Sequence, residues 1–221
     1  MFEKSFKYLL LLKKNNTREW YHANKAMFVD ARLEFEHITE LLLYEVSRFD
    51  PRIAGLQPGD CIFRIYRDIR FSSDKTPYKT NFGTYLVPGG RKSGYAGYYL
   101  HIEPGGSFIA AGIYMPPSSV LTAIRKDIYN YHEEFKSILH SGKIKELFGE
   151  MSGEKLKSQP RGFPKDFEDS EFLKYKSYSL IRMKKDHEMM QKNAIREIVN
   201  CFQVSSPFIK FLNEAIDHAE R

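Results

Sequence analysis

The sequence predicts a single-domain α+β fold in which a central, mostly antiparallel sheet is flanked by N-terminal and C-terminal helices. Apolar residues recur at helical spacing at both ends of the chain, whereas the middle holds four stretches rich in aromatic and β-branched residues. Short turns containing proline and glycine separate the later stretches, which favours antiparallel pairing. No stretch of the 221 residues has the composition of a linker, so we expect one domain over residues 1–221.

The N-terminal part is predicted to be helical. Apolar residues at helical spacing indicate a first helix near residues 2–10. Asn16, followed three positions later by Glu19, resembles a capping box that would start the next helical stretch. A long helix is expected over residues 25–47 and ends before Pro51, because a residue that precedes proline is pushed out of the helical region.

The middle of the chain is predicted to form the sheet. Strands are expected at residues 61–66, 82–87, 95–103 and 107–115. Pro104 and the two glycines after it lie between the last two stretches and predict a hairpin there.

The C-terminal part returns to helix, with one late strand. A helix that starts at Ser118 or Ser119 is expected to reach about residue 140. The remaining expected elements are a short helix at 142–148, an irregular segment at 155–171, a strand at 176–183, a helix from Asp186 towards Cys201, and a last helix at 208–219 with Pro207 near its start.

Basic charge is concentrated in one segment. The net charge of the chain is +6, and residues 61–92 hold seven basic side chains against two acidic ones. Local positive charge attracts phosphate-bearing partners. The two cysteines have no CxxC spacing and are expected to be reduced thiols in a cytoplasmic protein. No window approaches the roughly 20 apolar residues of a membrane span, so no membrane partner is expected.

A dense basic motif occupies residues 64–79. If the first strand continues through Arg70, alternation places Arg64, Tyr66, Asp68 and Arg70 on one face and Phe71 on the apolar face. Guanidinium groups bind phosphate or carboxylate through two parallel hydrogen bonds, so this face is a candidate anion site. The predicted anion-binding residues are Arg64, Arg67, Arg70, Lys75, Tyr78 and Lys79.

An internal ion-pair network is the alternative interpretation of the same motif. It would join Arg64 and Arg70 to Asp68, and Lys75 to Asp74. Such networks are common and often contribute little to stability. The residue pattern leaves both interpretations open.

Four residues are candidates for proton transfer: Asp68, Asp74, His101 and Glu103. His101 and Glu103 are two apart on a predicted strand and share a face, with Tyr99 beside them. Such a pair suits acid–base chemistry, since imidazole titrates near neutral pH. No further ligand stands at metal-site spacing, so no metal site is predicted. The other histidines lie on predicted helices without partners at metal-ligand spacing and are interpreted as surface or interface residues: His22, His37, His132, His140, His187 and His218.

The motif resembles the signature R-x-x-R-D-x-R-F-x-x-D-K-x-x-Y of a family of bacterial conserved hypothetical proteins, domain-of-unknown-function family 2461. The matching positions are Arg64, Arg67, Asp68, Arg70, Phe71, Asp74, Lys75 and Tyr78. Residues 15–20, 98–106, 160–163 and 176–178 also look like this family, so the resemblance covers nearly the whole chain. It implies a set of shared residues and no established activity.

Three hypotheses for the function follow. The first is binding or turnover of a small anionic, phosphate-bearing ligand at the arginine-rich face; the second is a nucleic-acid-binding module; the third is a structural or partner-binding domain with internal ion pairs. The chain contains no P-loop, dinucleotide-binding, nucleophile-elbow or HExxH motif, which disfavours the corresponding enzyme classes. The sequence specifies no cofactor, and it does not decide whether the protein is an enzyme or an oligomer.

Overall fold

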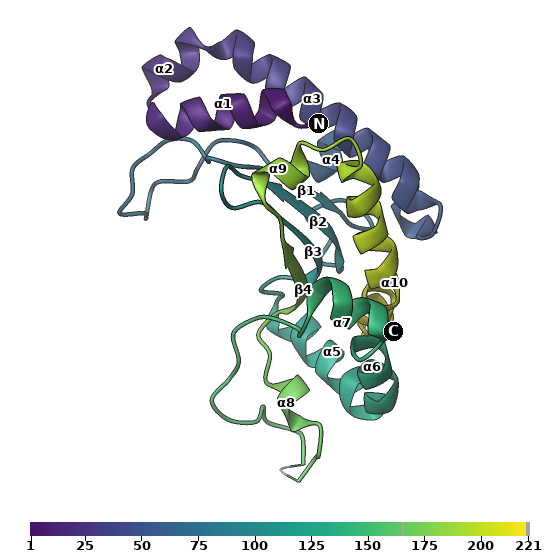
Figure 1. Cartoon of the computed structure of the whole chain (residues 1–221). Helices are drawn as coiled ribbons and strands as arrows, with labels where there is room; N and C mark the ends of the chain where they lie inside the picture. The colour runs from purple at the N-terminus through teal and green to yellow at the C-terminus, as the bar shows by residue number, and fades with distance from the viewer. Residues whose placement is uncertain (165, 220–221) are drawn as a thin grey trace.

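The computed structural model describes residues 1–164 and 166–219 and has the predicted α+β architecture. A sheet lies at the centre, with helices above and below it in the view of Figure 1. The helices are α1 (Glu3–Lys14), α2 (Arg18–Ala23), α3 (Lys25–Ser47), the 3-10 turn η1 (Pro51–Ile53), α4 (Pro58–Cys61), α5 (Ser118–Asn130), α6 (His132–Leu139), α7 (Gly142–Phe148), α8 (Ser170–Leu173), α9 (Asp186–Met189) and α10 (Ala194–Ala219).

The sheet is antiparallel throughout, in the order β1-β2-β3-β4. Its strands are β1 (Phe82–Leu86), β2 (Gly97–Ile102), β3 (Phe108–Ile113) and β4 (Tyr178–Met183). The predicted hairpin joins β2 and β3, and the amide of Gly106 donates to the carbonyl of Glu103 over 2.9 Å. In the sheet register, His101 lies opposite Gly83 on one side and Phe108 on the other.

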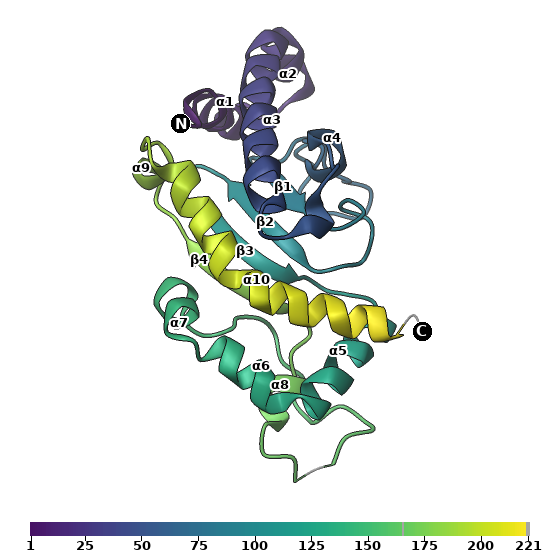
Figure 2. The same cartoon turned by 90° about the vertical axis from the view of Figure 1, so that its right-hand side faces the viewer.

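Helices α3 and α10 cover one face of the sheet, as Figure 2 shows. Phe35 of α3 packs against Phe82 with ring centres 5.4 Å apart, and Phe202 of α10 packs against Tyr98 at 5.3 Å. Burial of these aromatic side chains supplies much of the driving force for folding.

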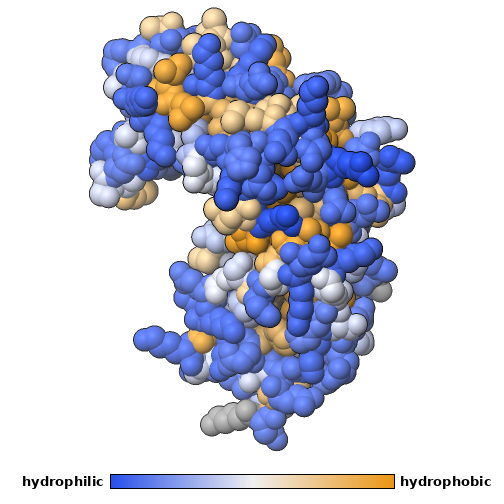
Figure 3. Space-filling model, in the orientation of Figure 1, coloured by the Kyte–Doolittle hydropathy of each residue, from blue (hydrophilic) through white to orange (hydrophobic). Residues whose placement is uncertain are grey.

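The opposite face of the sheet has no helix packed on it in the part of the chain that the structure describes (Figures 1 and 2). It faces a hollow in the outline of the molecule, between α1–α3 above and α5–α8 below (Figure 3). Tyr99, His101, Ala110 and Ile181 on this face are only partly buried. We call it the open face.

The expected first strand is wrong. Residue Cys61 ends α4. The segment from Ile62 to Tyr78 forms no strand, and its residues make only two isolated bridges, Ile62 with Thr84 and Tyr66 with Tyr78. The expected cap is also wrong, because Thr17, not Asn16, accepts the hydrogen bond that starts α2. The side chain of Asn16 instead bonds the backbone N–H and C=O of Tyr78, at 3.1 and 2.9 Å.

The boundaries of the C-terminal helices differ from the prediction, because one expected helix is divided in two and two expected helices are joined into one. The helix expected from Ser118 to about residue 140 breaks at Tyr131 into α5 and α6. In contrast, α10 runs through Pro207, where a helix start was expected. Proline cannot donate to the carbonyl of Gln203, and the hydroxyl of Ser206 does so instead, over 2.9 Å.

Across residues 1–164 and 166–219, every helix is either too short or too polar to cross a lipid bilayer.

Candidate anion site on the open face

The basic motif folds as an irregular hairpin beside β1. The amide of Phe63 donates to the carbonyl of Gly83, and farther out Arg67 N–H donates to Pro77 C=O over 3.0 Å. Between these paired segments, residues 67–77 project from the edge of the sheet as a loop that we call the arm (Figure 1). The motif is therefore carried by a projecting loop and not by a strand of the sheet.

Most charges of the arm are paired within it. Arg70 forms a two-pronged ion pair with Asp68, at 3.0 and 2.7 Å. Arg67 contacts Asp74 at 2.5 Å, and Lys75 donates to the carbonyl of Ile69 over 3.0 Å. The predicted network is thus correct for Arg70 with Asp68, but Asp74 pairs with Arg67 and not with Lys75.

The pKa values of the two arm carboxyls follow from these bonds. Hydrogen bonds from the side chain and backbone of Arg70 lower the pKa of Asp68. Those from the backbone and hydroxyl of Thr76, followed by Arg67, lower the pKa of Asp74. Both carboxylates are charged near neutral pH and brace the arm.

Phe71 does not lie on an apolar face. Its side chain is 96% exposed, whereas Ile65 is only 4% exposed. The strand-like alternation holds near Ile65, where the chain still pairs with its neighbour, and is lost once the chain enters the arm. The guanidinium carbon of Arg70 lies 5.8 Å from the centre of the Phe71 ring.

Arg64 and Lys79 differ from Arg67 and Arg70 because neither has a carboxylate at ion-pair distance among the described residues, which is also true of Lys75 on the arm. They lie on the two facing segments of the hairpin, and Lys79 is the one whose charge acts on His101 of the open face. Burial, followed by the positive charge of Arg64, lowers the pKa of Lys79. The ammonium of Lys79 lies 5.5 Å from the centre of the Phe63 ring.

His101 lies next to these cations and is hydrogen-bonded at both ring nitrogens. Its Nε2 is 3.2 Å from Oε2 of Glu103, and its Nδ1 is 2.9 Å from the hydroxyl of Tyr99. Thr80 donates to the other oxygen of Glu103 over 2.8 Å. The ring of Phe108 stacks on the imidazole with centres 4.5 Å apart. The imidazole is therefore held in one orientation.

These contacts assign the proton of the neutral imidazole. An ionised Glu103 can only accept, so Nε2 carries the hydrogen and the lone pair of Nδ1 accepts from Tyr99. Burial lowers the pKa of His101 below its model-compound value of 6.5, and the charge of Lys79 adds to this against the opposing effect of Glu103. His101 is consequently neutral at pH 7.

The structure thus brings Lys79, His101 and Glu103 together and sets Arg64 beside Lys79. Tyr78 is buried and stacks on Tyr21 with ring centres 4.4 Å apart, which removes it from any ligand surface. The remaining predicted site residues lie on the arm: Arg67, Asp68, Arg70, Asp74 and Lys75.

Three polar neighbours of this site were not predicted as site residues: Thr80, Asn81 and Tyr99. Tyr99 is detectable in the sequence, because it shares the face of a strand with His101 and Glu103. The positions of Thr80 and Asn81 beside Glu103 and His101 depend on how the hairpin pairs with β1, and no local sequence pattern predicts that pairing.

A second cluster surrounds Asp169. His132, Glu133, Glu168 and Asp169 hold their ligand-type atoms within 4.8 Å of one another. The ammonium of Lys136 lies 3.1 Å from Asp169 and 3.4 Å from Glu133, so this cluster already contains a cation. His132, interpreted from the sequence as a surface or interface residue, bonds Asp169 over 2.9 Å.

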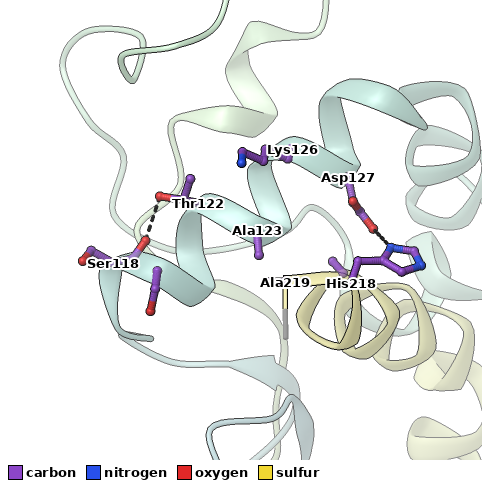
Figure 4. A pocket seen from close by; sticks show the side chains of 9 residues that line it. Ser118, Thr122, Ala123, Lys126, Asp127, His218 and Ala219 are labelled. Carbon is purple, nitrogen blue, oxygen red and sulfur yellow. Dashed lines mark hydrogen bonds and ion pairs between the residues drawn. The ribbon is translucent and has the colours of Figure 1, made fainter. Parts of the chain in front are cut away.

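A pocket of about 570 Å³ lies between the start of α5 and the end of α10 (Figure 4). Asp127 and His218 meet across it at 2.8 Å. Ser118 and Thr122 line the far end of the pocket, away from this pair. No predicted site residue contributes to its lining.

Comparison with known proteins gives one match. A family model described as "Conserved hypothetical protein (DUF2461)" matches residues 4–211, a range that includes the arm and the open face. No curated protein and no solved structure matches the chain significantly.

Proposed function

This chain belongs to that family of conserved hypothetical proteins, and we propose that it binds a small anionic, phosphate-bearing ligand on the open face of the sheet. The observation that supports this proposal is the pair of cations Arg64 and Lys79. Burial and then the charge of Arg64 lower the pKa of Lys79, and neither side chain has a carboxylate at ion-pair distance among the described residues, although Arg64 also adds to the effect of Arg70 in lowering the pKa of Asp68.

Lys79 is half-buried and Arg64 is exposed, and two neighbouring like charges repel each other unless a negative charge compensates them. A phosphate group would supply that charge. Arginine contributes a planar fork of donors and lysine a compact point charge, a combination that suits a phosphate with several oxygens. The binding residues in this proposal are therefore Arg64 and Lys79, while Arg67, Arg70 and Lys75 shape the arm beside the site.

The proposal includes proton transfer to or from the bound anion. His101 is neutral at pH 7, and Glu103 accepts from its Nε2–H. A carboxylate in this position stabilises the imidazolium that forms when the ring takes up a proton. Asp68 and Asp74, which are committed to the arm, then have a bracing role instead of a catalytic one.

The test is a thermal-shift and calorimetric panel at low salt with inorganic phosphate, sugar phosphates, nucleotides and carboxylic acids. A ligand at 100 times its dissociation constant adds about 2.7 kcal/mol. For a domain of this size, each kcal/mol moves the midpoint by about 2–4 °C. We expect a phosphate ester to raise the midpoint of the wild type, and the shift to be lost in Arg64→Gln and Lys79→Gln.

Arg70→Gln is the matched control, because Arg70 lies on the same motif but is already paired with Asp68. It should keep the ligand-induced shift. An equal loss in all three variants would indicate general electrostatic attraction and contradict the proposed site. The same conclusion follows if no member of the panel shifts the wild type.

Nucleic-acid binding is a second candidate, favoured by the exposed ring of Phe71 beside the guanidinium of Arg70. Bases stack on exposed aromatic rings with about 1–3 kcal/mol per base. In this case Phe71→Ala weakens the binding of a single-stranded oligonucleotide, and the affinity for the oligonucleotide falls steeply with salt. Phosphate esters bind the variant and the wild type equally well.

A further inference from the structure

We propose that the hydroxyl of Tyr99, and not the imidazole of His101, is the group that takes a proton from a ligand on the open face, with His101 as the acceptor behind it. Glu103, His101 and Tyr99 form a linear relay in this proposal. The inference deepens the proposed function and names its substrate class as an anion that carries a hydroxyl group.

The first argument is that both nitrogens of His101 are occupied. Nε2 bonds Glu103 at 3.2 Å and Nδ1 bonds Tyr99 at 2.9 Å, while Phe108 covers one side of the ring. A ligand proton therefore has no open lone pair on the imidazole. It can reach Nδ1 only through the oxygen that already donates to it.

The second argument is the position of Tyr99. Its ring is partly exposed on the open face, with its hydroxyl over Gly83, the residue opposite His101 in the sheet. The rings of Phe63 and Tyr85 contact it edge-on, at centre distances of 6.1 and 6.4 Å. Lys79 lies over Phe63, so this cation borders the same place.

The step balances without a further reactant. The O–H bond of the ligand breaks as a new O–H bond forms on Tyr99. The original O–H bond of Tyr99 breaks as an N–H bond forms at Nδ1 of His101. The ligand oxygen keeps the electron pair and faces Arg64 and Lys79, while Glu103 balances the imidazolium.

The acidity of both groups fits a concerted transfer. Burial raises the pKa of Tyr99 to about 12, with the charge of Glu103 acting in the same direction. Free tyrosinate is therefore scarce near neutral pH. The hydroxyl reacts only when His101, which is neutral there, removes its proton in the same step.

Benzenesulfonyl fluoride tests this relay on the full chain without knowledge of the natural ligand. Attack by the phenol forms an O–S bond, breaks the S–F bond and releases fluoride, while the phenolic proton passes to the base. Peptide mass spectrometry then gives a labelling rate for each tyrosine. Tyr44 and Tyr114 are internal controls, because they are 66% and 82% exposed and have no base at their hydroxyls among the described residues.

We expect Tyr99 to be labelled faster than both controls despite its greater burial. His101→Gln should lower its rate by about 100-fold, the size of a typical general-base contribution, and leave the controls unchanged. Labelling of Tyr99 no faster than Tyr114 in the wild type would overturn the proposal. So would an unchanged rate in a folded His101→Gln variant.

Nitrogen-15 NMR of the wild type provides a measurement that needs no variant. The relay requires the hydrogen on Nε2 of His101, and a hydrogen on Nδ1 contradicts it. Phosphate binding separates this inference from the proposed function. If the wild type binds no phosphate compound of the panel but Tyr99 is labelled rapidly, only the anion site is refuted. If phosphate binds but Tyr99 is labelled slowly, only the relay is refuted.

Discussion

The hydroxyl of Tyr99 lies 2.5 Å from the position that a Cβ atom would take at Gly83. No side chain fits between them, so the bond between Tyr99 and His101 depends on a glycine in the neighbouring strand. The requirement is one of space, since Gly83 has no positive φ.

Gly83→Ala should therefore displace the Tyr99 ring from His101. The new methyl group meets a ring whose movement is limited by packing, and overpacking of this kind costs about 1–3 kcal/mol. We expect a lower melting midpoint and labelling of Tyr99 at the rate of an ordinary tyrosine. Gly59→Ala is the control, because a Cβ at Gly59 meets nothing within 4 Å. A variant with wild-type labelling would show that Tyr99 does not need this approach.

Stability should fall as His101 is protonated. Its pKa in the fold lies below 6.5, so between the two pKa values the unfolded chain binds the proton more readily. The contribution of neutral His101 is complete above about pH 6.5 and is lost as the pH falls from there to the folded pKa. Urea unfolding of wild type and His101→Gln between about pH 7.5 and pH 5 measures it. The free-energy difference between them should shrink with falling pH, and a constant or growing difference contradicts the prediction.

The hydroxyl of Ser206 should stabilise α10 only because Pro207 is present. Removing it in Ser206→Ala leaves the carbonyl of Gln203 without its 2.9 Å donor, at a cost of about 0.5–1 kcal/mol. In a Pro207→Ala background, the restored backbone N–H of residue 207 donates to the carbonyl of Gln203. Adding Ser206→Ala to that background should then cost almost no unfolding free energy. A double-mutant cycle by urea unfolding compares the two losses. Equal values would mean that the hydroxyl does not replace the proline's missing donor.

Asn213 of α10 holds the start of β2 through a buried pair of hydrogen bonds. It accepts from the N–H of Ala96 at 2.8 Å and donates to its C=O at 3.1 Å. Asn213→Leu leaves both groups buried without partners, and we expect a loss of about 2–4 kcal/mol in unfolding free energy. Asn200→Leu, at an exposed position of the same helix, should change stability little. Similar losses of unfolding free energy at both positions would show that the hydrogen bonds between Asn213 and Ala96 are not the cause.

The arm should depend on Arg67 for its order and contribute little to global stability. In Arg67→Gln, the bonds to Asp74 and Thr76 are lost, so amides of residues 67–77 should exchange faster with deuterium. The midpoint should move by less than about 4 °C, since exposed ion pairs contribute about 0–1 kcal/mol. Lys92→Gln, outside the arm, is the control. Unchanged exchange in the arm would show that other contacts order it.

Much of the fold could be predicted because local rules and tertiary packing agree. The helix expected over residues 25–47 coincides with α3, and each of the four strands β1 to β4 overlaps a predicted stretch. One error occurs where a distant contact replaces a local one, because the side chain of Asn16 bonds Tyr78 instead of capping α2. Another is local, because the hydroxyl of Ser206 bonds Gln203 and allows the helix to pass Pro207.

The site shows the same division. The contact between His101 and Glu103 follows from the two-residue period of a strand, which places alternate side chains together. Which cations of the motif remain without acidic partners could not be predicted, because Arg67 meets Asp74 across a loop whose course is not periodic. The exposure of Phe71 has the same origin.

The covering of the sheet by α10 also affects when the protein can fold during synthesis. Strands β1 to β3 are neighbours in the chain and can pair as soon as residue 113 has left the ribosome. The part of their apolar face that α10 covers waits for residues 194–219, so Tyr98 stays without Phe202 while about 90 further residues are translated. During that interval the nascent chain exposes an unfinished apolar surface, and surfaces of this kind are prone to aggregation until they are covered.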